Sequence, residues 1–238
     1  MRRMSTKYFI LSKSGESAVD DNRENQIVFL NTRGVQYILP QNNLTYYADR
    51  GLFENQLIEW CKQFCGPDKV FLDIGAHTGT YALTMASRCK HVYAFEPQKM
   101  TYYALCGGVA LSFLENVTCF NFGLGSSEQT GKNTLKIISN DGGGSSLHAE
   151  SGVLREEEIE IRRLDDLNIS DIGFIKMDVE NNELYVLQGA LETLARSDYP
   201  KILFESNQEN EVLFGFIRGL GYSVVPIGGT YNMFLASV

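Results

Sequence analysis

Four acidic residues stand where apolar runs of the sequence end. They are Asp73, Glu96, Asp178 and Glu205. The carboxyl ends of parallel strands meet at one edge of a sheet, and ligands bind at that edge. A single acid in such a place is often an N-cap or a first-turn residue of the next helix. Four acids at four predicted strand ends favour a binding site that carries ionisable groups.

The first of these acids belongs to the stretch 70–79, which reads Val-Phe-Leu-Asp-Ile-Gly-Ala-His-Thr-Gly. An apolar run, a glycine-spaced turn and a helical pattern indicate a buried strand that leads into a helix, as in a doubly wound sheet. The glycines allow the backbone to approach a ligand closely, and the start of the helix offers free N–H groups. This stretch therefore predicts a site for a nucleotide-like cofactor.

The acid and the glycines also indicate which cofactor binds. A dinucleotide fingerprint has three glycines, whereas only Gly75 and Gly79 follow Asp73 here. The Asp73 carboxylate would repel a pyrophosphate, but it suits S-adenosylmethionine, which has an ammonium, a sulfonium and no phosphate. Glu96 follows at close to the ~20-residue offset at which an acid binds ribose hydroxyls, a feature that nicotinamide cofactors share. We expect the cofactor site to consist of Glu54, Asp73, Gly75, Ala76, His77, Gly79, Thr80, Glu96 and Pro97.

A second unusual stretch, 174–183, contains charged residues within an apolar run. A central parallel strand is expected to be almost continuously apolar, yet Lys176 and Asp178 interrupt this one. Because side chains alternate along a strand, both point to the same face. Burying either one unpaired would cost several kcal/mol. The two could form an ion pair that caps the next helix, or a polar pair that handles a substrate hydroxyl in the cleft. We favour the second interpretation.

Alternating strand and helix patterns surround these stretches. Beyond the strand at 70–74, they predict helices at 53–65, 100–114, 184–194 and 212–220, and strands at 91–95, 117–122, 135–138, 159–161, 172–179 and 202–205, followed by strands at 222–227 and 232–236. The alternation predicts an α/β fold with a doubly wound, mostly parallel sheet that ends in an antiparallel pair. We assign 1–52 to an N-terminal arm and small β segment, with a hairpin or edge strands around Gly34, and 53–238 to the main domain with a β/loop insertion at about 126–165.

The composition restricts the class of protein. The 238 residues are 44% hydrophobic, which suits one globular domain with a full core. A net charge of −8 disfavours a nucleic-acid partner. Five scattered cysteines predict buried free thiols in a reducing compartment. Without a signal-peptide pattern or an apolar run of about 18 residues, the chain is expected to be cytoplasmic and to lack a membrane span.

Together the motifs resemble those of the FkbM family of methyltransferases. The matching stretches are 70–79, 92–97, 175–180 with Glu183, 187–190 and 202–205. The family usually has glycine after the acid of its third motif, where this chain has Asn181. Asparagine tolerates a left-handed backbone better than most residues, so we expect the turn to be kept. The resemblance implies a class I Rossmann-like methyltransferase fold, S-adenosylmethionine as donor, and O-methylation of a hydroxyl, often on a sugar, a glycolipid or a natural product.

The resemblance also suggests roles for the second stretch. A sugar hydroxyl is a poor nucleophile until its proton is removed, so Asp178 is the candidate general base. Lys176 would keep Asp178 ionised or orient the acceptor, and Glu205 is the further catalytic candidate. Alternatively, Asp178 and Glu205 hold a divalent cation that lowers the pKa of the acceptor hydroxyl.

The acceptor, a small molecule or glycan, is expected to contact Glu180, His148 and Ser146. The last two follow the triple glycine 142–144, which predicts a flap at 139–150, although a lone histidine beside glycines more often faces water. Two rival functions are an RNA ribose 2′-O-methyltransferase, which the acidic composition opposes, and a non-catalytic cofactor-binding regulatory domain, which would not require Lys176 with Asp178. A dehydrogenase is opposed by Asp73 and the missing third glycine.

Overall fold

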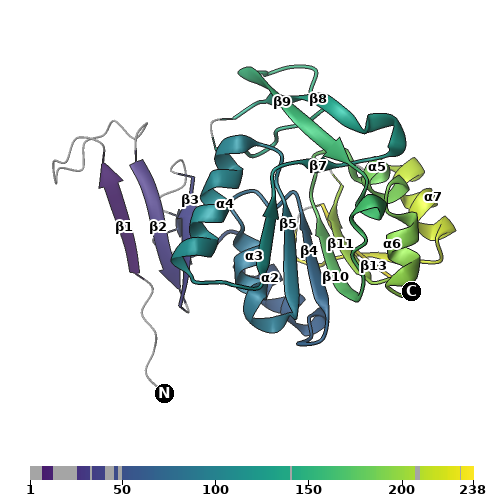
Figure 1. The fold of residues 1–238 in the computed structure, drawn as a ribbon, viewed down its shortest axis with the longest axis horizontal. Helices are drawn as coiled ribbons and strands as arrows, with labels where there is room; N and C mark the ends of the chain where they lie inside the picture. The colour runs from purple at the N-terminus through teal and green to yellow at the C-terminus, as the bar shows by residue number, and fades with distance from the viewer. Residues whose placement is uncertain are drawn as a thin grey trace.

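The computed structural model describes residues 7–12, 26–32, 34–40, 46–47, 50–139, 141–206, 210–230 and 232–238. Its centre is a seven-stranded sheet with helices on both faces (Figure 1). In spatial order the strands are β12 (Ser223–Pro226), β13 (Met233–Ser237), β11 (Lys201–Glu205), β10 (Ile172–Met177), β4 (Val70–Ile74), β5 (His91–Phe95) and β6 (Val117–Phe120). The five strands from β11 to β6 are parallel, and β13 is antiparallel to both β11 and β12. The doubly wound, mostly parallel sheet with a terminal antiparallel pair is therefore confirmed.

Two apolar cores lie on opposite faces of this sheet. One core packs against α2 (Asn55–Cys61), α3 (Thr80–Met85) and α4 (Lys99–Leu111), and the other against α5 (Glu183–Gln188), α6 (Leu191–Arg196) and α7 (Glu211–Gly219). All five residues of β4 are buried, as expected for a central strand covered on both faces. The predicted apolar run thus positions the glycine turn that follows it at one edge of the sheet.

The single helix predicted at 184–194 is wrong, because the chain forms two short helices there. Between α5 and α6, the Gly189 carbonyl accepts a hydrogen bond from the Asp165 N–H at 3.0 Å, so this carbonyl is turned away from a continuing helix. A side chain at Gly189 would also place its Cβ 2.0 Å from the Gly125 carbonyl oxygen. Contacts with a segment distant in sequence therefore break the helix.

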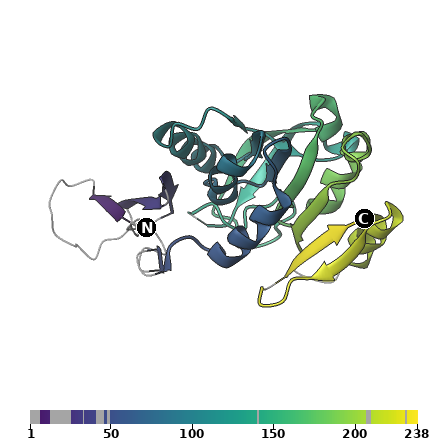
Figure 2. The same ribbon diagram turned by 90° about the horizontal axis from the view of Figure 1, so that it is seen from below.

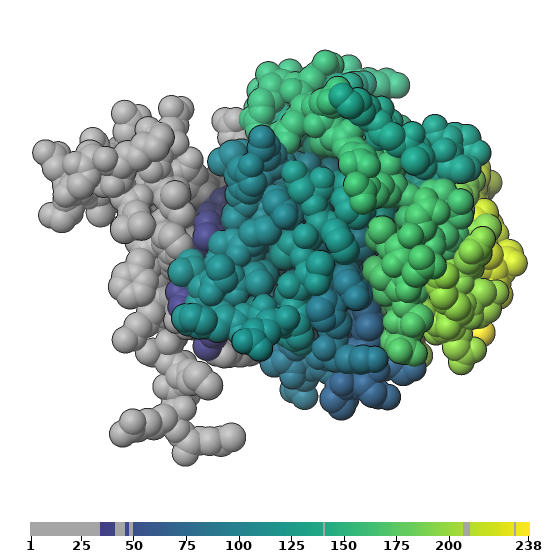
Figure 3. Space-filling view, in the orientation of Figure 1, coloured from purple at the N-terminus to yellow at the C-terminus, as the bar shows by residue number. Residues whose placement is uncertain are grey.

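Two smaller sheets flank the central one. The first consists of β1 (Lys7–Ser12), β2 (Gln26–Thr32) and β3 (Val35–Leu39), and its antiparallel β2–β3 pair confirms the hairpin predicted around Gly34. The second consists of β7 (Gly123–Leu124), β8 (Gly131–Ile137) and β9 (Arg155–Arg162). In the space-filling view, residues of β9 form the green upper rim of the molecule (Figure 3). The polar part of the N-terminal arm at 13–25 lies outside the described residues.

Helix α4 packs closely against its neighbours through two glycines. A Cβ on Gly107 would lie 2.5 Å from the Ile38 side chain of β3, and one on Gly108 would lie 2.6 Å from Leu83 of α3. The two glycines therefore let α4 approach the small N-terminal sheet and a neighbouring helix.

Two of the five cysteines, Cys61 and Cys89, are buried, and the other three are partly buried. All five cysteines are free thiols. Within the described ranges, no helix is both long enough and apolar enough to cross a bilayer.

Candidate active site

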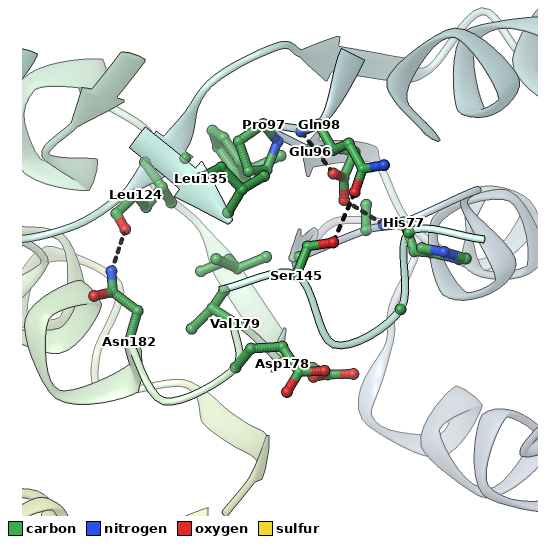
Figure 4. Close-up of a pocket in the computed structure, with 18 of the residues that line it drawn as sticks. His77, Glu96, Pro97, Gln98, Leu124, Leu135, Ser145, Asp178, Val179 and Asn182 are labelled. Carbon is green, nitrogen blue, oxygen red and sulfur yellow. Dashed lines mark hydrogen bonds between the residues drawn. The ribbon is translucent and has the colours of Figure 1, made fainter. Parts of the chain in front are cut away.

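A cavity of about 270 Å³ opens at the carboxyl edge of the central sheet (Figure 4). The segments after β4, β5 and β10 form its floor, and residues of the β7–β9–β8 sheet form an apolar wall. Of the sequence-predicted residues, those that line it are Glu54, Gly75, Ala76, His77, Thr80, Glu96, Pro97, Lys176, Asp178 and Glu180. The structure therefore brings most of the expected cofactor and catalytic residues to one place.

The turn after β4 approaches the segment after β10 very closely. Gly75 has φ +76°, and a Cβ there would lie 1.8 Å from the Asp178 carbonyl oxygen, so no other residue fits without movement of the backbone. His77 also has a left-handed backbone, with φ 52°, and its N–H donates to the Glu96 carboxylate at 2.8 Å. The glycine turn thus joins the first predicted motif to the second.

Glu96 is held by donors from its own neighbourhood. Its carboxylate accepts hydrogen bonds from the backbone N–H groups of His77 and Gln98 and from the Thr101 hydroxyl, at 2.8, 2.9 and 2.9 Å. Burial raises the pKa of Glu96, although these hydrogen bonds oppose the shift. A carboxylate offers about four acceptor sites, so three donors leave roughly one for the expected ribose hydroxyl.

Asp73 lies behind the cavity wall. It is completely buried and does not line the cavity. One of its oxygens accepts the N–H of Ala82 in α3 at 2.8 Å, and the other lies 4.0 Å from the Lys176 ammonium without a hydrogen bond. Burial raises the pKa of Asp73 to about 6, against the opposing effect of Lys176. Its charge can reach a ligand only across Lys176 and the wall. Gly79, the N-cap of α3, also lies outside the lining.

Lys176 and Asp178 form the expected ion pair, but the pair does not cap the next helix, α5, whose N-cap is Asn182. The Lys176 ammonium donates to the Asp178 carboxylate at 3.2 Å and to the Gly75 carbonyl at 3.0 Å, and both residues line the cavity. Burial lowers the pKa of Lys176, but the nearby carboxylates, chiefly Asp178 and Asp73, raise it above its ordinary value overall. Burial likewise raises the pKa of Asp178, but Lys176 outweighs this effect and holds it below its usual range. The pair is therefore a stable cation and anion at the edge of the cavity.

Glu205 and Glu180 complete a group of three carboxyls with Asp178. Oxygen atoms of the three lie within 4.8 Å of one another, because β10 and β11 are parallel neighbours and end side by side. Burial and the adjacent Asp178 charge raise the pKa of Glu205 to about 9, so Glu205 carries a proton at neutral pH and hydrogen-bonds with Asp178. Glu205 lies next to the cavity lining rather than within it.

The turn after Asp178 has an unusual backbone. Glu180 and Asn181 both have positive φ, 52° and 74°. Asn181 stands where the FkbM family usually has glycine, and the expected left-handed turn is kept. Non-glycine residues in this region cost about 1–3 kcal/mol each and cluster at functional sites. Glu54 and His77, on other walls of the same cavity, share the conformation.

The loop that carries the triple glycine bridges the two sides of the cavity. His77 Nε2 lies 2.6 Å from the Asp141 carbonyl oxygen, and the Ser145 hydroxyl donates to the Gln98 side chain at 3.0 Å. On the other side, the Ser146 hydroxyl donates to the Glu180 carbonyl at 2.6 Å. In Figure 4, Ser145 lies between Glu96 on one side and Asp178 on the other.

His148 and Ser146, the expected acceptor contacts, do not line the cavity. His148 Nε2 lies 2.9 Å from Asn182 Oδ1, and its ring stacks on Tyr185 of α5. Both residues thus attach the loop to the segment after β10, and Glu180 is the one expected acceptor contact on the cavity surface.

Sequence reasoning missed the apolar wall and one buried hydroxyl. The wall consists of Phe95, Leu124, Leu135, Leu147, Ile159 and Ile161. Period-two alternation predicted strands at 135–138 and 159–161, yet it could not tell that their buried face meets a ligand cavity. Tyr81 also lines the cavity, and its hydroxyl donates to Glu54 at 2.9 Å. The helical pattern after Gly79 gave no signal for this contact.

The chemistry of this lining fits S-adenosylmethionine. The apolar wall suits a flat adenine ring, and Glu96 lies beside it with a free acceptor site for a ribose hydroxyl. At the other end, the carboxylate of Glu54 suits the ammonium group, and that of Asp178 suits the sulfonium. A pyrophosphate would meet carboxylates along this lining, so a dinucleotide fits less well.

Solved structures of methyltransferases resemble this chain in fold. An FkbM methyltransferase from Methylobacillus flagellatus superimposes with a TM-score of 0.52 at 19% identity, over 72% of this chain and 44% of that one. An rRNA methylase from Streptococcus thermophilus gives a TM-score of 0.49 at 13% identity, over 77% and 93% of the two chains. A candidate methyltransferase from Streptococcus mutans in complex with S-adenosylhomocysteine gives 0.49 at 12% identity, over 77% and 94%. No curated protein matches the sequence.

The assignment to a family rests on the sequence and not on the structural comparisons. This chain spans less than half the length of the Methylobacillus protein, so that comparison supports the Rossmann-like methyltransferase fold alone. Residues 73–224, more than half of the chain, match the model of the Methyltransferase FkbM domain. The match contains the glycine turn, Glu96, the Lys176–Asp178 pair and Glu205. The chain therefore belongs to the FkbM methyltransferase family.

Proposed function

We propose that this protein transfers a methyl group from S-adenosylmethionine to a hydroxyl of a sugar or glycan. The observation that most supports this proposal is the ionised Lys176–Asp178 pair, which lies at the edge of a cavity that suits the cofactor. Cofactor binding alone would not require a buried cation paired with a half-buried anion at this position. A hydroxyl acceptor would require a carboxylate that stays ionised.

Each residue has a distinct part in this proposal. Bound S-adenosylmethionine supplies a methyl group activated by a positively charged sulfur. Asp178 accepts the proton of the acceptor hydroxyl, and Lys176 fixes its position through a second hydrogen bond to the Gly75 carbonyl. Glu205 donates a hydrogen bond to Asp178 and limits the build-up of negative charge. Alignment of the reactants supplies the remaining advantage, and the close-packed turn at Gly75 keeps these groups in place.

The three carboxyls also support a metal-dependent variant. Asp178, Glu180 and Glu205 have the oxygen ligands that Mg²⁺ or Mn²⁺ prefers, and their atoms lie within 4.8 Å of one another. In that variant the carboxyls would hold the cation, and the cation would lower the pKa of the acceptor hydroxyl. The ammonium of Lys176, which is already paired with Asp178, favours the metal-free form.

A methyl-transfer assay tests the proposal. The protein is incubated with labelled S-adenosylmethionine and a panel of methyl glycosides and oligosaccharides, with an RNA oligonucleotide as the rival acceptor. We expect label on sugar hydroxyls, no label on RNA, and no loss of activity with a chelator. Label on ribose 2′-hydroxyls would instead favour the RNA enzyme, and chelator-sensitive activity restored by Mg²⁺ would favour the metal variant.

Calorimetry tests the cofactor separately. S-adenosylhomocysteine should give heat of binding and NAD should give none. The reverse pattern would exclude the methyl donor. Binding of S-adenosylhomocysteine without transfer to any acceptor class would favour a regulatory domain.

A further inference from the structure

A second and larger cavity lies beside the candidate active site. It has a volume of about 1040 Å³ and lies between α2 and the hairpin of β12 and β13. We call it the hairpin groove, and its walls include Leu57 and Trp60 of α2 and residues 225–230 of the hairpin. Figure 2 shows the blue segment that contains α2 and the yellow C-terminal hairpin along the same side of the molecule. Its volume is at the upper end of the roughly 300–1,000 Å³ typical of ligand sites.

Glu54 connects the hairpin groove with the candidate active site. Its side chain lines both cavities. The Tyr81 hydroxyl binds the Glu54 carboxylate, and the Glu54 charge acts on the pKa of Lys176. The groove therefore meets the active site near Lys176 and Asp178, where the acceptor hydroxyl must react. Glu96, at the other end of the active site, does not line the groove.

The lining of the hairpin groove is both aromatic and polar. Trp60 and Val225 stay 36% and 50% exposed, although both are large and apolar. Asn55 and Gln56 lie on the same wall, and neither side-chain amide has a hydrogen-bond partner within the described parts of the chain. The groove thus offers an open indole face next to unused amide donors and acceptors.

This combination suits a carbohydrate better than the other candidate ligands. A pyranose ring has an apolar C–H face that stacks on an indole, and a rim of hydroxyls that amides bind. A lipid chain would leave the amides desolvated and unpaired. A nucleic acid would need several cations along its backbone. Among the described lining residues Arg50 is the sole basic residue, and its guanidinium lies over the Tyr46 ring at 5.8 Å.

We propose that the hairpin groove binds the oligosaccharide part of the acceptor, with Trp60 as a stacking platform, and leads its terminal sugar past Glu54 to Asp178. This inference rests on the proposed function and adds to it that the acceptor has more than one sugar unit. The volume of the groove exceeds that of the active-site cavity, so the groove has room for units beyond the reacting one.

The chain contains one tryptophan, so its fluorescence reports directly on this groove. In the presence of S-adenosylhomocysteine, the protein is titrated with cellotriose, maltotriose and chitotriose and with the matching monosaccharides. We expect a trisaccharide to change the emission of Trp60 at concentrations where its monosaccharide does not. In the methyl-transfer assay, Trp60→Ala should raise the KM for that trisaccharide by about 5- to 150-fold, the range for a ring stacked on an aromatic side chain, as measured with nucleic-acid bases. The KM for the monosaccharide and the affinity for S-adenosylhomocysteine should stay within about twofold.

Two further variants distinguish the loss of stacking on Trp60 from a general loss of folding. Trp60→Phe keeps an aromatic ring against Phe64, which Trp60 contacts edge-on at 4.8 Å, and should give an intermediate KM. Phe113→Ala removes an exposed aromatic ring that lines neither cavity and should change nothing.

The outcomes separate the groove from the proposed function. Methylated sugars together with unchanged Trp60 emission and equal KM values in all variants would show that the hairpin groove does not bind the acceptor. The proposed methyl transfer to sugars would then still hold. A response of Trp60 to a trisaccharide without methylation of any sugar would support saccharide binding in the groove. It would overturn the proposed methyl transfer to sugars. No response in either measurement would overturn both.

Discussion

Glu96 and Glu205 are two buried or half-buried acids at the same edge of one sheet, yet they have opposite surroundings. Glu96 follows β5 and meets three hydrogen-bond donors from the adjoining turn and helix. Glu205 ends β11 and meets two other acids. A carboxylate surrounded by donors is a preformed binding group. A carboxyl surrounded by acids keeps a proton that can be exchanged during chemistry.

Lys176 marks the boundary between these two regions. Its ammonium binds the Gly75 carbonyl on the cofactor side and Asp178 on the acceptor side. One cation thus neutralises part of the acidic group without reaching Glu96. In the proposed function, the same residue type at equivalent strand ends binds the cofactor on one side and supports proton removal by Asp178 on the other. Substitutions near Glu96 and substitutions near Asp178 and Glu205 should therefore affect cofactor affinity and turnover separately.

The largest expected effect is on turnover, from Asp178→Asn. The amide keeps the size and cannot accept the proton, so turnover should fall by about 10²–10⁴-fold, the range for loss of a general base. Affinity for S-adenosylhomocysteine should be unchanged, as measured by calorimetry. Asp171→Asn is a matched control, because Asp171 lies at the opposite end of β10 in an exposed ion pair with Lys90. Near-normal turnover of Asp178→Asn would remove Asp178 from the mechanism, because asparagine can replace an acid that only caps a helix.

The second effect is on cofactor affinity, from Glu96→Gln. The new amide turns one donor toward the N–H and O–H groups that now bind Glu96, and it weakens the hydrogen bond to a ribose hydroxyl. Binding of S-adenosylhomocysteine should weaken by about 1.5–3 kcal/mol, or about 10- to 150-fold, the scale of hydrogen bonds to a charged group. Glu205→Gln should leave this affinity unchanged. Equal losses in both variants would contradict the division of the edge into two regions.

Much of the site could be predicted because its residues interrupt local patterns. The glycine turn after β4 and the Lys176–Asp178 pair both depart from what a buried strand requires. Spacing also assigned Asp73 to the cofactor, but it cannot tell whether a carboxylate points at a ligand or at a backbone N–H. In the structure Asp73 binds the N–H of Ala82 instead.

The parts that could not be predicted depend on long-range packing. The apolar wall comes from strands whose alternation is ordinary, and only the pairing of β7, β8 and β9 turns their buried face toward the cavity. The break between α5 and α6 depends on contacts of Gly189 with Gly125 and Asp165, which no local pattern shows. Local sequence patterns therefore predict the residues that form the floor of the cavity, but not those that form its apolar wall.

The third effect is on pH dependence, and it sharpens the contrast at Glu205. The folded pKa of about 9 lies above the ordinary 4.5, so the folded protein binds more protons than the unfolded one between these values. The stabilisation from protonated Glu205 is complete below about pH 4.5 and is lost as the pH rises to about 9. Denaturation midpoints should therefore fall from pH 5 to pH 8.5, and Glu205→Gln should reduce this fall. Burial also raises the pKa of Glu183 to about 7 and that of Asp73 to about 6, and both add a decline in the same direction. An unchanged slope in Glu205→Gln would show that Glu205 ionises normally.

The smallest expected effect concerns the loop that bridges the two regions, through Ser145→Ala. This change removes the hydroxyl that donates to Gln98 on the cofactor side and leaves the Ser146 contact with Glu180 on the acceptor side. One neutral hydrogen bond contributes about 0.5–1.5 kcal/mol, so the loop should open about 2- to 10-fold more often in the free variant. Hydrogen exchange of amides in 141–147, followed by mass spectrometry, measures this opening, and peptides from β10 serve as the internal control.

If the loop is a flap, cofactor and acceptor together should slow exchange in both proteins, because closure needs the backbone freedom of the triple glycine. Slow and identical exchange in the free wild-type and variant proteins would instead identify a rigid packed loop, and the two regions would then be joined by a fixed wall.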